Sequence, residues 1–297
     1  MKKHPLKEWI LATRPWSFPA SAMPVIVTWV YLYGLHAGVN WENGIWALVN
    51  IVLFHAAGNV WSDYFDYRKG VDTVDTFGAT TLTSGKFSPG EIFSLGLGLL
   101  GVAVLLGVGL LIRTGLPLLW IGLGGIFCTL LYPFFKYRAL GDVIIFMAYA
   151  LLPSWGTSYV ILGFIDMQVY WVAVPIGLIT VAILHANNTR DVVTDVQAGI
   201  KTFAICTGYS VARRVYAVEI LFSFVWIGIG IVMGYFSWWT LLVMVVFPLA
   251  WGNVRLMLSS AREEVGNIAH LDEKTAQLQL AFSSVLSLAL LVSIWLA

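Results

Sequence analysis

Two clusters of acidic and amide side chains stand out in a chain with few charges. The first reads Asn59-Val-Trp-Ser-Asp63-Tyr-Phe-Asp66 and continues to Asp72 and Asp75. The second reads Asn187-Asn188-Thr-Arg190-Asp191-Val-Val-Thr-Asp195. Residues three or four apart share a face of a helix, so the Asn and Asp side chains of each cluster are predicted to point the same way. In both clusters, an asparagine precedes an aspartate by four residues, which indicates that the same motif occurs twice.

Such clusters favour binding of a metal and a phosphate. Like charges this close repel each other unless a cation lies between them. Carboxylate and amide oxygens suit a hard divalent ion, and Mg²⁺ typically binds through a few carboxylates together with substrate phosphates. Basic side chains near the clusters are candidates for further phosphate contacts: Lys69, Lys86, Lys136, Arg138, Arg190 and Lys201. Ordinary helix caps at a charged interface are the alternative, but caps need neither the repeat nor the asparagines.

The composition places these clusters in a membrane protein. The chain has 297 residues, of which 59% are hydrophobic and 11% charged, whereas about a quarter of a soluble domain is charged. A soluble enzyme, a nucleic-acid-binding protein and a disordered chain are therefore excluded. The two cysteines, Cys128 and Cys206, have no metal or redox spacing. We predict one transmembrane domain over residues 1–297, with the lipid bilayer as its surroundings.

Nine apolar stretches of about 20 residues are each long enough to cross a bilayer. Helices fit them better than strands, because the alternation typical of a membrane barrel is missing. The predicted spans are 16–36, 44–65, 91–112, 116–135, 142–163, 168–188, 213–236, 238–258 and 276–296. Two connections are long, 66–90 and 189–212, so the clusters fall in two motif regions, 59–90 and 187–212.

The basic residues predict the orientation. Of the 17 Lys and Arg residues, all but Arg113 fall in the N-terminal segment or around the connections after even-numbered spans. Cytoplasmic loops carry the excess of Lys and Arg, so the N-terminus and both acidic clusters are expected on the cytoplasmic side. We expect an integral, multi-pass protein of the bacterial inner membrane whose active site faces the cytoplasm.

A diphosphate site beside an apolar interior indicates an amphiphilic substrate. Metal ions that neutralise a diphosphate make it a good leaving group, and an allylic diphosphate then ionises to a delocalised carbocation. Apolar spans would shield that cation from water. Aromatic faces would stabilise it, and the candidates are Trp61, Tyr64, Phe65 and Tyr132.

With these features the chain resembles the UbiA superfamily of intramembrane prenyltransferases. The resemblance covers nearly the whole chain and rests on nine helices, the two Asp-rich motifs after helices two and six, and Tyr132-Pro-Phe-Phe-Lys136 after helix four. Within the superfamily it is most similar to the 1,4-dihydroxy-2-naphthoate polyprenyltransferases of menaquinone biosynthesis. The matching pieces are Arg14-Pro15, Asn59-x3-Asp63-x2-Asp66-x5-Asp72 and Asn187-Asn188-x-Arg190-Asp191-x3-Asp195-x3-Gly199.

The resemblance implies an all-α fold of nine transmembrane helices around a central cavity. It also implies that Mg²⁺ and diphosphate are bound by Asp63, Asp66, Asp191 and Asp195, and that Asp72 joins this catalytic set. The resemblance implies that Asn59 and Asn187 or Asn188 support these ligands and that Lys136 lies near the diphosphate. Tyr132, Arg190 and Lys201, chosen above for their ring or charge, complete the candidate substrate-binding residues. The implied reaction joins a polyprenyl chain to the naphthoate carbon that bears the carboxylate, with loss of diphosphate and CO₂, giving demethylmenaquinone.

Several alternatives stay open at this point. The stretch from Thr73 to Gly85 lacks the arginine and proline that the naphthoate enzymes usually have there, which leaves other acceptors: 4-hydroxybenzoate, homogentisate, haem, chlorophyllide or a glyceryl phosphate. An ion-coupled transporter is the alternative from another class, since intramembrane acids often mark ion paths. His55 and His185 precede the motifs and are either acceptor contacts or hydrogen-bonded between helices.

Overall fold

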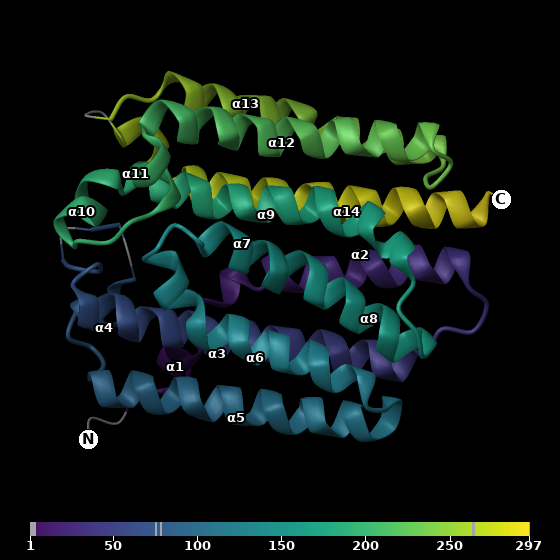
Figure 1. Cartoon of the computed structure of the whole chain (residues 1–297), viewed down its shortest axis with the longest axis horizontal. Coiled ribbons are helices and arrows are strands. Elements are labelled where there is room, and N and C mark those ends of the chain that lie inside the picture. Colours follow the sequence, from purple (N-terminus) through teal and green to yellow (C-terminus); the bar gives the residue numbers. More distant parts are fainter. Residues whose placement is uncertain (1–3, 75, 78, 263–264, 297) are drawn as a thin grey trace.

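The computed structural model of the chain describes residues 4–74, 76–77, 79–262 and 265–296. Those residues are almost entirely helical and include no strand. Figure 1 labels the helices in chain order: α1 Leu6–Ala12, α2 Pro19–Leu35, α3 Trp41–Lys69, α4 Thr80–Thr83, α5 Pro89–Thr114, α6 Pro117–Lys136, α7 Gly141–Phe146, α8 Leu152–Leu162, α9 Tyr170–Arg190, α10 Val192–Gln197, α11 Phe203–Thr207, α12 Tyr209–Val232, α13 Phe247–Ser259 and α14 Leu271–Trp295.

The prediction of nine spans is confirmed. Within the described residues, nine helical segments are long and apolar enough to cross a membrane: Pro15–Leu35, Trp41–Lys69, Pro89–Thr114, Pro117–Lys136, Gly141–Leu162, Met167–Arg190, Tyr209–Val232, Trp238–Ser259 and Val265–Trp295. Five of them are composite, and three of these begin with a short 3₁₀ turn: Pro15–Ser17, Met167–Val169 and Val265–Ile268. A π-helical turn, Met147–Leu151, joins α7 to α8, and a 3₁₀ stretch, Trp238–Val246, precedes α13.

The second span is longer than its apolar run. α3 continues through Asp63 and Asp66 to Lys69 and ends at Gly70, whose left-handed backbone (φ 76°) terminates the helix. A C-terminal glycine in this conformation is a common helix stop because it carries no Cβ to clash. The first acidic motif therefore stands on a rigid helix and not in a loop.

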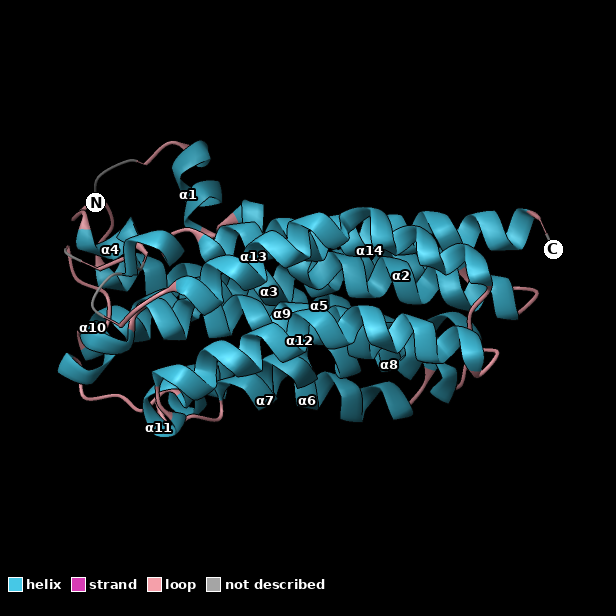
Figure 2. Cartoon of the chain, turned by 90° about the horizontal axis from the view of Figure 1, so that it is seen from above, coloured by secondary structure: helices cyan, strands magenta, loops and turns pink. Residues whose placement is uncertain are grey.

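The long helices lie side by side, and the short helices α4, α10 and α11 gather at one end of the bundle (Figures 1 and 2). The largest buried apolar cluster joins α2, α9, α12, α13 and α14. On the outer faces of α5 and α12, large apolar side chains such as Ile112 and Val232 are 80% and 86% exposed. Such surfaces are suited to contact with lipid.

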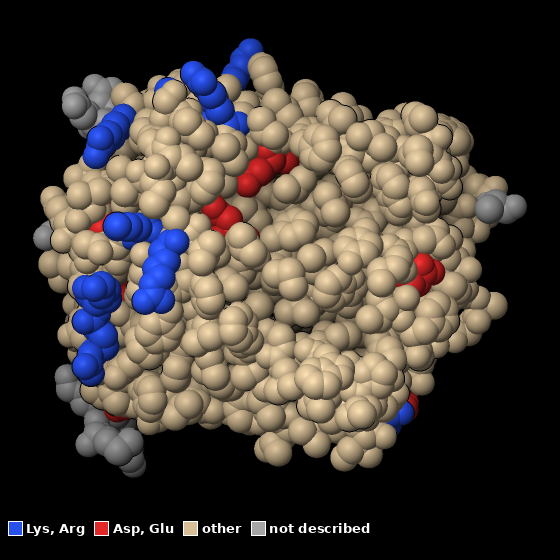
Figure 3. Space-filling view, in the orientation of Figure 1, with Lys and Arg blue, Asp and Glu red and all other residues tan. Residues whose placement is uncertain are grey.

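Charge is distributed unevenly along the bundle. On the face shown in Figure 3, Lys and Arg side chains concentrate at the end that carries α4, α10 and α11. Arg113 lies at the opposite end, at the C-terminus of α5, where it pairs with Glu42. This distribution agrees with the predicted alternation of the connections. Asp75 of the first acidic cluster, and Lys2 and Lys3 of the basic N-terminal segment, lie outside the described residues.

Candidate active site

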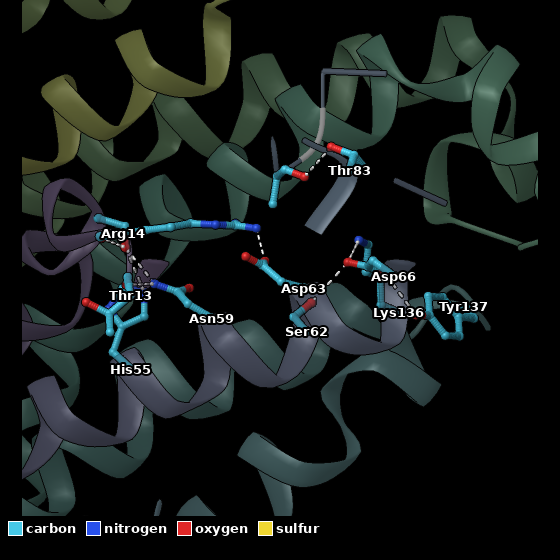
Figure 4. A network of polar contacts seen from close by, with 12 residues as sticks. Thr13, Arg14, His55, Asn59, Ser62, Asp63, Asp66, Thr83, Lys136 and Tyr137 are labelled. Carbon is cyan, nitrogen blue, oxygen red and sulfur yellow. Dashed lines mark hydrogen bonds and ion pairs between the residues drawn. The ribbon is translucent and has the colours of Figure 1, made fainter. Parts of the chain in front are cut away.

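Asp66 is the centre of a polar network at the end of α3 (Figure 4). The Asp66 side chain is 4% exposed. It accepts hydrogen bonds from Lys136 Nζ at 3.0 Å, Tyr137 Oη at 2.8 Å and Ser62 Oγ at 3.1 Å. Lys136 ends α6, so this network joins the first acidic motif to the segment that follows the fourth span. The negative charge of Asp66 raises the pKa of Tyr137, in the same direction as burial of its hydroxyl.

Asp63, one turn earlier, faces the N-terminal segment. It is 2% exposed and pairs with Arg14, while its Oδ2 is buried and has no hydrogen-bond partner among the described residues. Arg14 adopts a left-handed backbone (φ 55°, ψ 61°), which non-glycine residues adopt only at a cost and often at functional sites. The sequence places Arg14 ahead of the first span but does not predict this contact, which closes over 49 residues of chain.

Asn59 and His55 tie α3 to the same segment. Asn59 Nδ2 donates to the carbonyl of Thr13 and to Ser17 Oγ, both at 2.9 Å. The ring nitrogens of His55 lie 2.9 Å from Ser21 Oγ and 3.3 Å from Ser17 Oγ. His55 therefore links two spans, as one of its two interpretations expects, and it also lines the cavity described below.

The second motif spans a break between two helices. α9 ends at Arg190, Asp191 is the junction, and α10 begins at Val192. Arg190 holds the junction together, because it donates to both oxygens of Asp191 at 2.7 and 2.8 Å and to Asn187 Oδ1 at 2.9 Å. Asp195 therefore stands on a different helix from Asn187, although its amide still donates to the Asp191 carbonyl at 2.8 Å.

Asp195 and Asp72 are largely buried and form no ion pair among the described residues. Burial raises the pKa of Asp195 to about 7, and the nearby charges of Asp191 and Asp66 act in the same direction. Burial and the charge of Asp66 likewise raise the pKa of Asp72 to about 6. Since Asp66 influences both, the two acidic motifs lie within electrostatic range of each other.

Both motifs border one elongated cavity with a volume of about 780 Å³. Its polar mouth is lined by Arg14, Asn59, Asp66, Asp72, Tyr132, Lys136, Asn187, Asn188, Arg190, Asp191 and Asp195. Beyond the mouth the lining becomes apolar and extends to Leu110 and Val160. Along α3, the lining runs from Asp66 back to Ala47, which at 1.5 Å per residue is ~28 Å.

Two predicted site residues do not line this cavity. Asp63 lies behind Arg14, as described above. Lys201 is exposed and follows α10, and its backbone amide donates to the Tyr137 carbonyl at 3.0 Å. Within the described part of the chain, the ammonium group of Lys201 forms no hydrogen bond or ion pair with the other candidate residues.

Three of the four aromatic candidates lie on the face of α3 that points away from the cavity. Trp61, Tyr64 and Phe65 pack against one another and against Phe93 and Phe134 of the neighbouring helices. None of the three lines the cavity, whereas the fourth candidate, Tyr132, does. The aromatic residues that do line it, and that the sequence pattern does not single out, are Trp16, Phe54, Phe77 and Tyr149.

The donor set fits a hard cation, although its members are not gathered around one point. Among the described residues, no group of three or more His, Cys, Asp or Glu side chains is close enough to hold a metal ion. Arg14, Lys136 and Arg190 instead pair with the motif carboxylates. The partnerless Asp63 Oδ2 and the carboxyls of Asp72 and Asp195, which lack an ion-pair partner, are hard oxygen donors of the kind that Mg²⁺ prefers.

The fold and this cavity define a polytopic membrane protein with a site that is acidic and basic at its mouth and apolar in its depth. The model of the UbiA prenyltransferase family matches residues 22–270. The chain therefore belongs to the UbiA prenyltransferase family.

Individual relatives agree with this assignment. The chain is 34% identical, over 216 residues, to UbiA prenyltransferase domain-containing protein 1 of Gallus gallus, and the match covers 71% of this chain and 65% of the relative. A digeranylgeranylglyceryl phosphate synthase has a similar fold, with 15% identity and a TM-score of 0.63 over 98% of this chain and 99% of its own. A UbiA homologue from Archaeoglobus fulgidus, solved with GPP and Mg²⁺, has 13% identity and a TM-score of 0.59 over 94% and 99%.

Proposed function

We propose that this protein transfers a polyprenyl group from an allylic diphosphate to an aromatic acceptor, and that the acceptor is 1,4-dihydroxy-2-naphthoate. The observation that carries the proposal is the continuity of the cavity. A mouth lined by acidic and basic side chains opens directly into an apolar chamber, which is the shape and polarity of a prenyl diphosphate.

The mouth would hold the diphosphate. Lys136 and Arg190 line it and are charge-assisted donors for phosphate oxygens, and Arg14 lies beside them. Mg²⁺ would be held by Asp63, Asp66, Asp191 and Asp195 and would make the diphosphate a better leaving group. Two findings support this requirement: among the described residues Asp195 has no ion-pair partner and Asp63 Oδ2 accepts no hydrogen bond, and the related archaeal structure contains GPP and Mg²⁺.

The chamber would protect the reacting carbon. When the allylic C–O bond breaks, the diphosphate takes the electron pair and the allylic carbon becomes cationic. Tyr132 and Tyr149 line the cavity near its mouth, so their rings are placed to stabilise that charge. A new C–C bond then forms at the naphthoate carbon that bears the carboxylate, and the carboxylate leaves as CO₂, which returns the electron pair to the ring. The product is a 2-polyprenyl-1,4-dihydroxynaphthalene, the reduced form of demethylmenaquinone.

The acceptor assignment rests on the motif resemblance, and the other acceptors named above are the alternatives within the family. The chain spans only 65% of the length of its relative from Gallus gallus, so that protein's activity is not transferred wholesale.

For orientation, we propose that the basic end of the bundle lies in the cytoplasm of a bacterium, because Lys and Arg concentrate there. The cavity mouth would then face the cytoplasm.

Ion-coupled transport is the alternative from another class, and one observation bears on it. Asp142, His185 and Glu219 form a chain of buried charges inside the spans, with 3.2 Å between His185 Nε2 and Asp142 and 2.6 Å between His185 Nδ1 and Glu219. Intramembrane charges can mark an ion path. These three groups pair with one another and line no part of the cavity, so they favour a link between α7, α9 and α12.

The deciding experiment incubates purified full-length protein with Mg²⁺, a polyprenyl diphosphate and, in parallel, each acceptor named above. We expect a prenylated, decarboxylated product by mass spectrometry only with 1,4-dihydroxy-2-naphthoate, loss of turnover in EDTA and recovery with added Mg²⁺. A product with another acceptor alone would correct the acceptor and leave the chemistry intact. Metal-independent turnover would contradict the role of the carboxylates.

A further inference from the structure

A second hollow lies on the outside of the bundle, between α13 and α14. Its volume is about 970 Å³, and it shares no lining residue with the catalytic cavity. It is lined by Pro248, Leu249, Trp251, Gly252, Asn253, Val254, Arg255, Leu256, Leu258, Ser259, Lys274 and Gln277. We call it the α13–α14 groove.

Two cations border this groove without an anionic partner. Arg255 and Lys274 are both exposed, and neither forms an ion pair within the described residues. The guanidinium of Arg255 instead lies over the ring of Trp251, 5.4 Å from its centroid. The nearest acidic residues on α14 are engaged elsewhere, because Asp272 pairs with Arg190 and Glu273 with His270.

The neighbouring basic residue Arg213 behaves differently. It donates to the carbonyls of Leu258 and Ser260 and so closes the end of α13. Among the described residues, Arg255 and Lys274 make no comparable hydrogen bond to a helix end. Since α13 ends and α14 begins at the basic end of the bundle, both cations lie near the level expected for lipid headgroups.

The interior of the groove offers both a donor and free space. Asn253 lines it and is 2% exposed, and its Nδ2 finds no hydrogen-bond partner in the part of the chain that the structure describes. A buried amide donor left unsatisfied is costly, so an acceptor oxygen placed in the groove would relieve it. A Cβ added at Gly252 would meet nothing within 4 Å. Apart from Ser259 and Gln277, the remaining lining residues are apolar, among them Leu249, Leu256 and Leu258.

We propose that the α13–α14 groove is a binding site for an anionic phospholipid. The headgroup phosphate lies between Arg255 and Lys274, and an acyl chain follows the apolar wall toward Leu249. Basic pockets between transmembrane helices are suited to anionic headgroups. A lipid fits better than free phosphate because the groove continues below the cations as apolar surface, which only an attached hydrocarbon chain would cover.

The test is native mass spectrometry of the full chain in detergent, titrated with phosphatidylglycerol or with phosphatidylcholine of the same acyl chains. We expect tighter binding of phosphatidylglycerol. Each neutralised cation should weaken that preference about fivefold, and the double variant R255Q/K274Q about 25-fold. Gly252→Leu keeps both cations but fills the groove, so it should weaken binding of either lipid. Arg214→Gln removes an exposed charge of α12 that does not border the groove and should change nothing.

The outcomes separate the possible occupants. Equal affinity of the wild type for the two lipids, or an unchanged preference in R255Q/K274Q, would overturn the proposal. Competition by inorganic phosphate would show a phosphate site to which the acyl chain contributes nothing. Loss of a dimer mass in Gly252→Leu would show that a second copy of the chain occupies the groove. Either result would also overturn the proposal. Melting temperatures and prenyl transfer measured for every variant exclude misfolding as the cause.

Discussion

Lys136 offers the sharpest test of the proposed site. Its ammonium is largely buried, lines the cavity mouth and donates to Asp66 at 3.0 Å. Lys136→Met retains an unbranched side chain of similar length and removes only the charge and its hydrogen bonds. If Lys136 binds the diphosphate, this substitution removes a charge-assisted donor at the point where negative charge develops on the leaving group.

The expected loss follows from that contact. A hydrogen bond to a charged group contributes about 1.5–3 kcal/mol. At 1.36 kcal/mol per factor of ten, kcat/KM for the prenyl diphosphate should fall about 10- to 150-fold. Most of the loss should appear in kcat, because the interaction strengthens as the C–O bond breaks. Lys136→Arg keeps the charge and should recover part of the activity.

The assay is initial-rate prenyl transfer by purified protein over a range of donor concentrations, with the melting temperature as a measure of folding. Arg214→Met is the matched control, since Arg214 is an exposed basic residue of α12 that does not line the cavity. A loss of less than threefold in folded Lys136→Met, or an equal loss in Arg214→Met, would refute the assignment of Lys136 to the diphosphate.

Four further predictions test other parts of the molecule. Asp63→Ala or Asp191→Ala should lower prenyl transfer about 100-fold or more without loss of folded protein, and near-normal turnover would refute the metal role. Gly125 lines the chamber, and a Cβ added there meets no atom within 4 Å, so a leucine side chain would occupy chamber space. Gly125→Leu should therefore favour the shorter donor and raise the ratio of kcat/KM for farnesyl diphosphate to kcat/KM for longer polyprenyl diphosphates about tenfold or more. An unchanged ratio would show that the prenyl tail lies elsewhere. In EDTA, the folded state holds the Asp195 proton up to a pKa of about 7, well above its ordinary value of 3.8, so this group costs stability as the pH rises through that interval. Asp195→Asn should therefore melt increasingly above the wild type from pH 5 to pH 8, and a constant difference would contradict this. A reporter fused after Ala297 should lie outside the cytoplasm; a cytoplasmic reading would contradict the orientation.

Local patterns in the sequence predicted much of the site. The spacing of Asn59, Asp63 and Asp66 predicts one helix face, and α3 does carry all three on a continuous helix. The second motif was less predictable. The helix breaks at Asp191 because Arg190 is held by Asp191, Asn187 and Asp272, and the last of these comes from α14. The spacing of residues within the motif does not predict that contact.

The aromatic candidates show a further limit of sequence patterns. Trp61, Tyr64 and Phe65 are close to the acidic residues along the chain, yet they point toward α5 and α6. Which face of α3 borders the cavity depends on where those helices pack. Similarly, Glu219 is an acid within an apolar span whose partner, His185, lies 34 residues away in another span.

The sequence by itself determined that this protein crosses the membrane nine times and carries two repeated acidic motifs at one end, because span length and helical spacing are local properties. Only the tertiary structure decided that both motifs border one cavity, that Arg14 pairs with Asp63 and Lys136 with Asp66, and that Lys201 stays outside. Those pairings join residues 49 and 70 positions apart. They arise from how the helices pack, since lipid-facing apolar side chains place no constraint on which helices become neighbours.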